Sequence, residues 1–322
     1  MKSNARSLLT LATTFAILML GGAILAQQRQ PAKPPAPTAA EAADDNIIRS
    51  EVTRVNMLIS VTDKRGRFVT DLTRGDFMIF ENKKPQSIKE FTAETDLPLR
   101  LAILIDTSAS VTDRFKFQQE AAGNFINSVV RDQDKAIVVS FDTAAELAAD
   151  LTGNTQVLEK AVRSLRPGGG TALYDAIFFA CKEKLMLDQP MYKFRRAMVV
   201  LSDGDDNQSQ HSRDQALEMA QRADTVIYTI STNISHTETE GDKVMRYFAD
   251  QTGGTPFFPF QANDLNQSFE NIANELRHQY NLFYAPEPLN NDGQYHKVLI
   301  KVKNRKDLIV RARKGYYARK PT

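Results

Sequence analysis

The chain has 322 residues, enough for one large and one small domain, and its 42% hydrophobic and 25% charged content is ordinary for a globular protein. Its net charge of +2 comes from Lys2 and Arg6, and the other 39 basic and 39 acidic residues balance, so no overall basic excess argues for nucleic acid or an anionic membrane. The single cysteine, Cys181, excludes an intrachain disulfide, so stability must come from a packed core.

The first 26 residues have the layout of a secretory signal peptide. Two basic residues precede a mostly apolar run over 8–20, and small residues follow up to Ala26. We therefore expect export, with the mature protein periplasmic, on the cell surface or secreted. An uncleaved membrane anchor is the alternative, because residues 8–26 approach the roughly 20 residues that span a bilayer.

Residues 27–46 are rich in proline, alanine and glutamine and carry almost no large apolar side chains. Such a segment cannot bury a core, so we predict a disordered linker.

The two ends of the remaining chain each hold a segment that is typical of β-structure. In residues 47–96 apolar and polar residues alternate from Val55 to Val61, and the turn sequence Asp63-Lys-Arg-Gly66 follows. Residues 279–322 hold three further strand-like runs. Because each segment alone has too few strands to be stable, we predict that they pair into one small β-sandwich.

The middle, residues 97–278, alternates short apolar, β-branched runs with helical segments. This alternation predicts an α/β fold: a doubly wound, mostly parallel six-stranded sheet covered by helices on both faces. The run AAELAADL is expected to add one short antiparallel edge strand. In such sheets, ligands bind beyond the carboxyl ends of the strands.

Polar residues follow the apolar runs at that edge. Asp106, Ser108 and Ser110 come after LAILI, Thr171 follows three glycines just before a helix, and Asp203 follows AMVVLS. Two carboxylates and three hydroxyls are hard oxygen ligands of low total charge. They suit Mg²⁺ with water completing an octahedron, with Mn²⁺ or Ca²⁺ as alternatives.

These three loops, in this order, resemble the von Willebrand factor A domain and its metal-ion-dependent adhesion site, in which a DxSxS motif opens the ligand set. The flanking phrases VTDKRGRFVTDLTRGDFMIFENKKPQSI and VRARKGYY resemble secreted bacterial proteins in which such a domain lies between β segments. The resemblance covers nearly all of the chain after the linker.

The resemblance implies a role for each residue. Ser108 and Ser110 would bind the metal directly, Thr171 directly or through water, and Asp106 and Asp203 mainly through water. A cation that is only weakly neutralised attracts an incoming carboxylate. The implied function is therefore non-enzymatic, metal-dependent adhesion to a protein partner that offers an Asp or Glu, with no nucleic-acid partner and no membrane contact beyond an uncleaved leader. The oligomeric state is unknown from the sequence.

Other interpretations compete with this one. DxSxS could be a helix N-cap, because Ser110 precedes a helical run. The three glycines lack the spacing of a nucleotide cradle. A phosphatase of the haloacid dehalogenase type also begins with a strand ending in aspartate, but it carries a second acid where this chain has Ser108. A structural envelope protein with a vestigial metal site remains a further alternative.

Residues near these loops have simpler expected roles. We expect Asp175 to be an acid that favours the start of its helix, and Asp205 and Asp206 to lie in a solvated loop. Cys181 shares a helical face with apolar residues and is expected to be a buried, unreactive thiol.

Overall fold

The protein is described by a computed structural model that covers residues 54–93, 97–190, 193–233, 235, 237–259, 262–289 and 291–318. The predicted signal peptide and linker, 1–26 and 27–46, lie outside these residues and stay predictions, as do the predicted domain boundaries. Within the described residues, no helix combines the length and the apolar character needed to cross a membrane.

Residues between the flanking segments form a six-stranded sheet with the order β10-β9-β8-β5-β6-β7. Its strands are β5 (Leu99–Asp106), β6 (Lys135–Phe141), β7 (Ala145–Thr152), β8 (Arg195–Ser202), β9 (Thr225–Ser231) and β10 (Pro256–Phe257). Neighbouring strands are parallel except β7, which runs antiparallel to β6 at one edge. The predicted α/β fold and its antiparallel edge strand at AAELAADL are thus confirmed.

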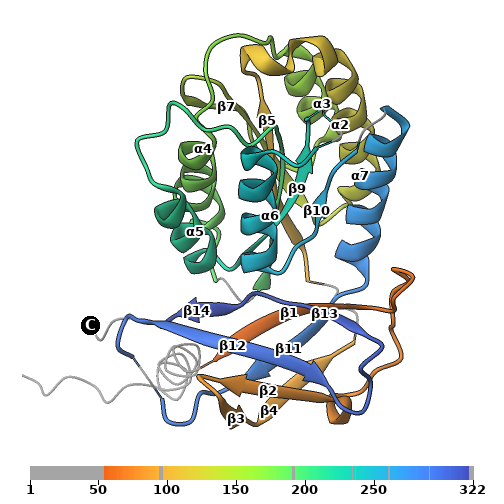
Figure 1. Ribbon diagram of the computed structural model, residues 1–322, viewed down its shortest axis with the longest axis vertical. Helices are drawn as coiled ribbons and strands as arrows, with labels where there is room; N and C mark the ends of the chain where they lie inside the picture. The colour runs from red at the N-terminus through yellow and green to blue at the C-terminus, as the bar shows by residue number, and fades with distance from the viewer. Residues whose placement is uncertain are drawn as a thin grey trace, which may run out of the picture. The chain divides into compact units, whose positions relative to one another are not determined.

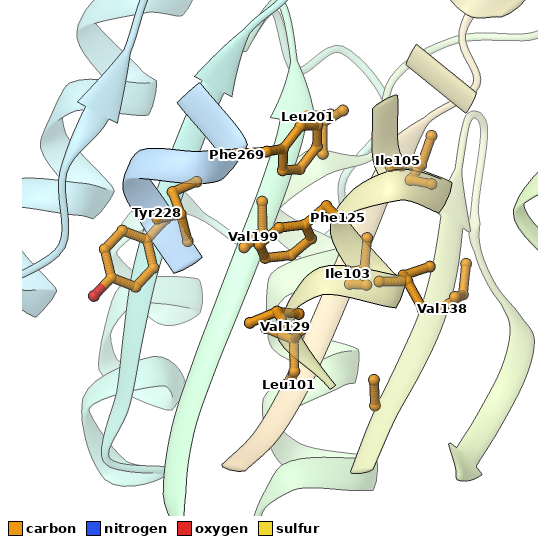
Figure 2. Packing of buried hydrophobic residues seen from close by; sticks show 14 of the residues in the cluster. Leu101, Ile103, Ile105, Phe125, Val129, Val138, Val199, Leu201, Tyr228 and Phe269 are labelled. Atoms are coloured by element: carbon orange, nitrogen blue, oxygen red, sulfur yellow. The ribbon is translucent and has the colours of Figure 1, made fainter. Parts of the chain in front are cut away.

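Helices cover both faces of this sheet. They are α2 (Phe115–Val129), α3 (Thr155–Ser164), α4 (Leu173–Ala180), α5 (Arg213–Arg222), α6 (Glu240–Thr252) and α7 (Ala262–Arg277). Strand β5 is buried on both sides: Ile103 and Ile105 pack toward α2 and α7, whereas Ala102 and Leu104 pack toward α4, α5 and α6. Figure 2 shows the first of these cores, where Phe125 of α2 and Phe269 of α7 stack over the sheet with ring centroids 4.7 Å apart.

The flanking segments form two four-stranded antiparallel sheets, with orders β13-β1-β11-β4 and β14-β12-β2-β3. The strands are β1 (Val55–Thr62), β2 (Phe77–Glu81), β3 (Lys84–Gln86), β4 (Ile88–Thr92), β11 (Tyr280–Tyr284), β12 (Tyr295–Val302), β13 (Ile309–Arg311) and β14 (Gly315–Tyr317). Each sheet combines strands from both ends of the chain, drawn in orange and blue in Figure 1. The two sheets share one apolar core, which confirms the predicted pairing of the two flanking segments.

Candidate functional site

Asp106, the last residue of β5, anchors the candidate site. It is fully buried, and its carboxylate accepts two hydrogen bonds: Oδ1 from the Ser108 N–H at 2.8 Å and Oδ2 from the Ser202 hydroxyl at 2.6 Å. Burial raises the pKa of Asp106 to about 6, and the nearby Asp203 charge adds to the rise. Ser202 was not among the residues predicted from the sequence, although it directly precedes Asp203.

The two serines of the motif connect Asp106 to the surface. Ser108 is buried and Ser110 is exposed, and their hydroxyl oxygens are 3.0 Å apart. The Ser110 hydroxyl also donates to Asp203 Oδ2 at 2.6 Å. A continuous line of oxygen atoms therefore runs from Ser108 to Asp203.

The N-cap interpretation of the motif is wrong. Ser110 lies inside the 3-10 segment Ala109–Arg114, and Ser108, which precedes that segment, makes no capping hydrogen bond through its side chain. The following helix α2 begins only at Phe115. The serine side chains are therefore directed at each other and at Asp203 instead of at helix amides.

Hydrogen bonds also bring the loop of Thr171 to this place. The Gly168 N–H donates to the Thr107 carbonyl at 2.6 Å, and the Ala109 N–H donates to the Gly169 carbonyl at 3.2 Å. Thr171 itself is buried, and its N–H donates to Asn207 Oδ1 at 3.0 Å. Each pair of the three predicted loops is thus bonded, and all five predicted residues lie on this one set of loops. Their role as metal ligands stays a prediction.

Glycines allow the close approach of these loops. Gly204 has φ of +81°, and a Cβ there would lie 2.3 Å from the Gly241 carbonyl oxygen at the start of α6. A Cβ on Gly170 would lie 2.8 Å from Asn207 Oδ1, the acceptor for Thr171. Gly170, which directly precedes Thr171, therefore serves loop packing.

The structure corrects the expectation for one neighbouring acid and adds to that for another. Asp206 was expected to be solvated, but its Oδ2 accepts the Tyr174 N–H at 2.9 Å in the first turn of α4. Asp175 was expected to be an acid that favours the start of its helix, and it lies in the first turn of α4. Its carboxylate also accepts the N–H groups of Gln210 and His211 and bonds the His211 ring at 2.6 Å. These bonds lower the pKa of Asp175 against the opposing effect of burial. Capping from a distant loop leaves no local sequence signal.

The donor set fits a hard divalent cation. Its oxygens come from two carboxylates and three hydroxyls, the ligand type that Mg²⁺ prefers. In the described part of the chain, no group of three or more His, Cys, Asp or Glu side chains is placed to hold a metal. A cation at this site would therefore depend on the hydroxyls, and the thiolate and imidazole chemistry typical of structural zinc is absent from it.

Comparison with known proteins agrees with this geometry. Residues 101–205 match the family model of the von Willebrand factor type A domain. The matched segment begins in β5 and ends just after Asp203, so it contains all five predicted site residues. No curated protein matches the sequence.

Solved structures also match this chain. A von Willebrand factor type A protein from Catenulispora acidiphila is 15% identical and has a TM-score of 0.51, with 75% of this chain and 72% of that chain covered. Protein BatB from Bacteroides thetaiotaomicron is 16% identical, with coverage of 55% and 98% and a TM-score of 0.45. Proximal thread matrix protein 1 from the mussel byssus was solved with a zinc-occupied metal-ion-dependent adhesion site (MIDAS) motif. It is 16% identical and has a TM-score of 0.49, with 60% of this chain and 48% of that chain covered.

Proposed function

We propose that Asp106, Ser108, Ser110, Thr171 and Asp203 hold a divalent cation, Mg²⁺ in the first instance, which binds an Asp or Glu carboxylate of a protein partner. The observation that carries this proposal is the line of oxygens from Ser108 through Ser110 to Asp203, which starts in the buried interior and ends at the surface. A cation beside Ser110 would therefore be accessible to a ligand from outside.

The site would bind a partner and catalyse no reaction. When present, the cation supplies the attraction for the partner's carboxylate. The protein's own residues hold the site in shape: Asp106 fixes Ser108 and Ser202 through its two oxygens, and the hydroxyl of Ser110 stays accessible. A phosphatase is disfavoured, because the carboxylate of Asp106 is fully buried and both of its oxygens already accept hydrogen bonds.

The charge of the region around the site indicates what kind of partner surface would bind there. Residues 97–278 contain 25 acidic and 18 basic residues, whereas the flanking segments 47–96 and 279–322 contain 11 acidic and 19 basic residues. Asp205 lies in the same loop as Asp203, and burial together with the charges of Asp203 and Asp242 raises its pKa. We therefore expect the partner's ligating carboxylate to lie in a neutral or basic surface, since an acidic one would be repelled.

We also propose that the protein acts after export, in the periplasm, at the cell surface or outside the cell. The support for this part is the sequence of residues 1–26, with its basic start, its apolar run and the small residues that end at Ala26.

Thermal unfolding of residues 27–322 tests the metal site. A cation present at 100 times its dissociation constant should stabilise the folded protein by about 2.7 kcal/mol over the protein in chelator. We expect this shift with Mg²⁺ or Mn²⁺ in the wild type and in Ser128→Ala, a control serine on α2 whose hydroxyl donates within its own helix. We expect it to be lost in Ser110→Ala and in Asp203→Asn.

A wild type that shows no shift at millimolar metal would contradict the proposal and favour the structural envelope protein. Turnover of an aryl phosphate that is abolished in Asp106→Asn would instead favour the phosphatase.

A further inference from the structure

The segment from Asp206 to His211 is hydrogen-bonded to the first turn of α4. This helix begins at Leu173, and its preceding residue, Ala172, has no side chain that could cap it. The first amides of a helix have no partner within the helix, so a cap must come from elsewhere. Here it comes from the loop that follows β8.

Side chains of that loop supply the missing caps one by one. Asp206 Oδ2 accepts the Tyr174 N–H at 2.9 Å, and the Ser209 hydroxyl oxygen accepts the Asp175 N–H at 3.0 Å. The same Ser209 hydroxyl donates to Asp206 Oδ2 at 2.6 Å, so the two caps are joined. The loop and the helix therefore hold each other.

Asn207 extends this arrangement to a predicted metal ligand. Its Oδ1 accepts the Thr171 N–H at 3.0 Å, and its own N–H donates back to the Thr171 carbonyl at 3.0 Å. The Gln208 N–H donates to the same carbonyl at 3.1 Å. The backbone of Thr171 is thus bonded on both sides by the residues that follow Asp203 at a distance of four and five positions.

At the far end, the loop is closed by a reciprocal contact. Asp175 accepts from the N–H groups of Gln210 and His211, and the His211 ring stacks on Phe178 of α4 with ring centroids 3.8 Å apart. The contacts from Asp206 to His211 form a clasp over two turns of α4.

We propose that Asp206 and Asn207 are positioning residues, which set the distance between Thr171 and Asp203 and so determine the metal affinity of the site. This inference rests on the proposed function. Thr171 and Asp203 belong to different loops, and the clasp joins these loops next to the two side chains. Mutation of a group that orients a metal ligand typically lowers the metal affinity by a factor of about 10 to 100.

Binding of Mn²⁺, followed through the paramagnetic resonance signal of the free ion, tests the affinity. We expect Asn207→Ala to weaken Mn²⁺ binding about tenfold and Asn207→Asp, which keeps the oxygen that accepts from Thr171, to restore it. Gln210→Ala is the control in the same loop, because Gln210 contributes its backbone N–H to the clasp. Val298→Ala, a core substitution in the flanking sandwich, controls for lost stability alone. Wild-type affinity in Asn207→Ala would overturn the inference.

Amide hydrogen exchange separates this inference from the proposed function. In metal-free protein, Asn207→Ala and Asp206→Ala should speed exchange at Thr171, Tyr174 and Asp175, whereas Gln210→Ala should leave it unchanged. A wild type that binds no Mn²⁺ would contradict the proposed function and the effect on affinity, and exchange would then decide whether the clasp holds Thr171. Unchanged exchange at these amides in both clasp variants would overturn the inference as well.

Discussion

The α/β region and the flanking sandwich each bury a carboxylate, but the two carboxylates have different surroundings. Glu81 in the sandwich is 3% exposed and accepts from the Tyr284 hydroxyl at 2.7 Å and the Tyr316 hydroxyl at 3.2 Å, with the His296 ring at 2.9 Å. Asp106 bonds Ser202 and the Ser108 amide, and from Ser108 the hydroxyls continue to the surface at Ser110. Both networks reach the surface, through His296 to Asp292 in the sandwich and through Ser110 in the α/β region, and they differ in the kind of side chain that forms them.

This difference indicates what each carboxylate is for. The partners of Glu81 are aromatic side chains that fill the sandwich core, and burial raises the pKa of both tyrosines. The partners of Asp106 are two small residues, the backbone N–H of Ser108 in the loop after β5 and the hydroxyl of Ser202 at the end of β8. The hydroxyl of Ser108 lies toward Ser110 and the surface. We interpret Glu81 as structural and Asp106 as the support of a binding site.

Removal of the Glu81 carboxylate should give the largest loss of stability. Glu81→Ala leaves two buried tyrosine hydroxyls without their acceptor and removes the buried partner of His296, which keeps Asp292 at the surface. Breaking a buried charged pair costs about 3–5 kcal/mol. Urea unfolding would measure this loss. Glu90→Ala is the matched control, because Glu90 pairs with Arg54 at the surface, where a salt bridge contributes about 1 kcal/mol or less.

Glu81→Ala should leave the metal site intact. Under conditions where the variant is still folded, the metal-induced stabilisation should equal that of the wild type, because Glu81 belongs to the other region. Loss of that stabilisation would show that the two carboxylate networks are not independent.

A second expected effect concerns the contact between the two regions. Glu275 of α7 is buried, and its carboxylate accepts from the Ser60 hydroxyl of β1 at 2.7 Å and from the Thr255 hydroxyl at 2.9 Å. Burial raises the pKa of Glu275 above its usual 4.5, although these hydrogen bonds act in the opposite direction. Burial in the folded protein therefore favours the neutral acid form of Glu275.

The sign of the pH dependence follows from this rise. The folded state holds the proton of Glu275 more tightly than the unfolded state, so the stability from this group is complete below pH 4.5. It is lost as the pH rises through the folded pKa, by at most about 1.4 kcal/mol for each pH unit in that window. Glu275→Gln should remove this loss, so the variant gains on the wild type as the pH rises. Glu270→Gln, exposed on the same helix, should show no such trend, and equal pH profiles for Glu275→Gln and wild type would contradict the assignment.

These two regions also differ in how far the sequence predicts them. The apolar run ending at Asp106 and the glycines before Thr171 are local signals, and parallel strands bring their ends to one edge, so the loops of the site could be predicted. The clasp could not, because Asp206 caps a helix that begins 33 residues earlier in the chain. The pairing of the two flanking segments could be predicted only because each segment alone has too few strands to be stable. The register of Val55 with Tyr284 depends on core packing between residues far apart in sequence.

The smallest expected effect is the absence of a reaction at Cys181. This residue follows directly after α4 and is fully buried with Leu173, Ile177 and Leu185, as predicted. Burial raises the pKa of its thiol to about 12, so almost no thiolate, the reactive form, is present at about pH 8. A disulfide reagent should therefore label the native protein only through opening of the structure, and denatured protein at once.

The labelling rate then reports on the helix that joins the candidate site to the core. Helix α4 begins beside Thr171 and ends next to Cys181, so Asn207→Ala should label faster than wild type if loss of the clasp loosens this helix. Mg²⁺ should slow labelling of the wild type and have little effect on Asp203→Asn. Labelling of native protein at the denatured rate would show that Cys181 is accessible and that α4 is not packed as described.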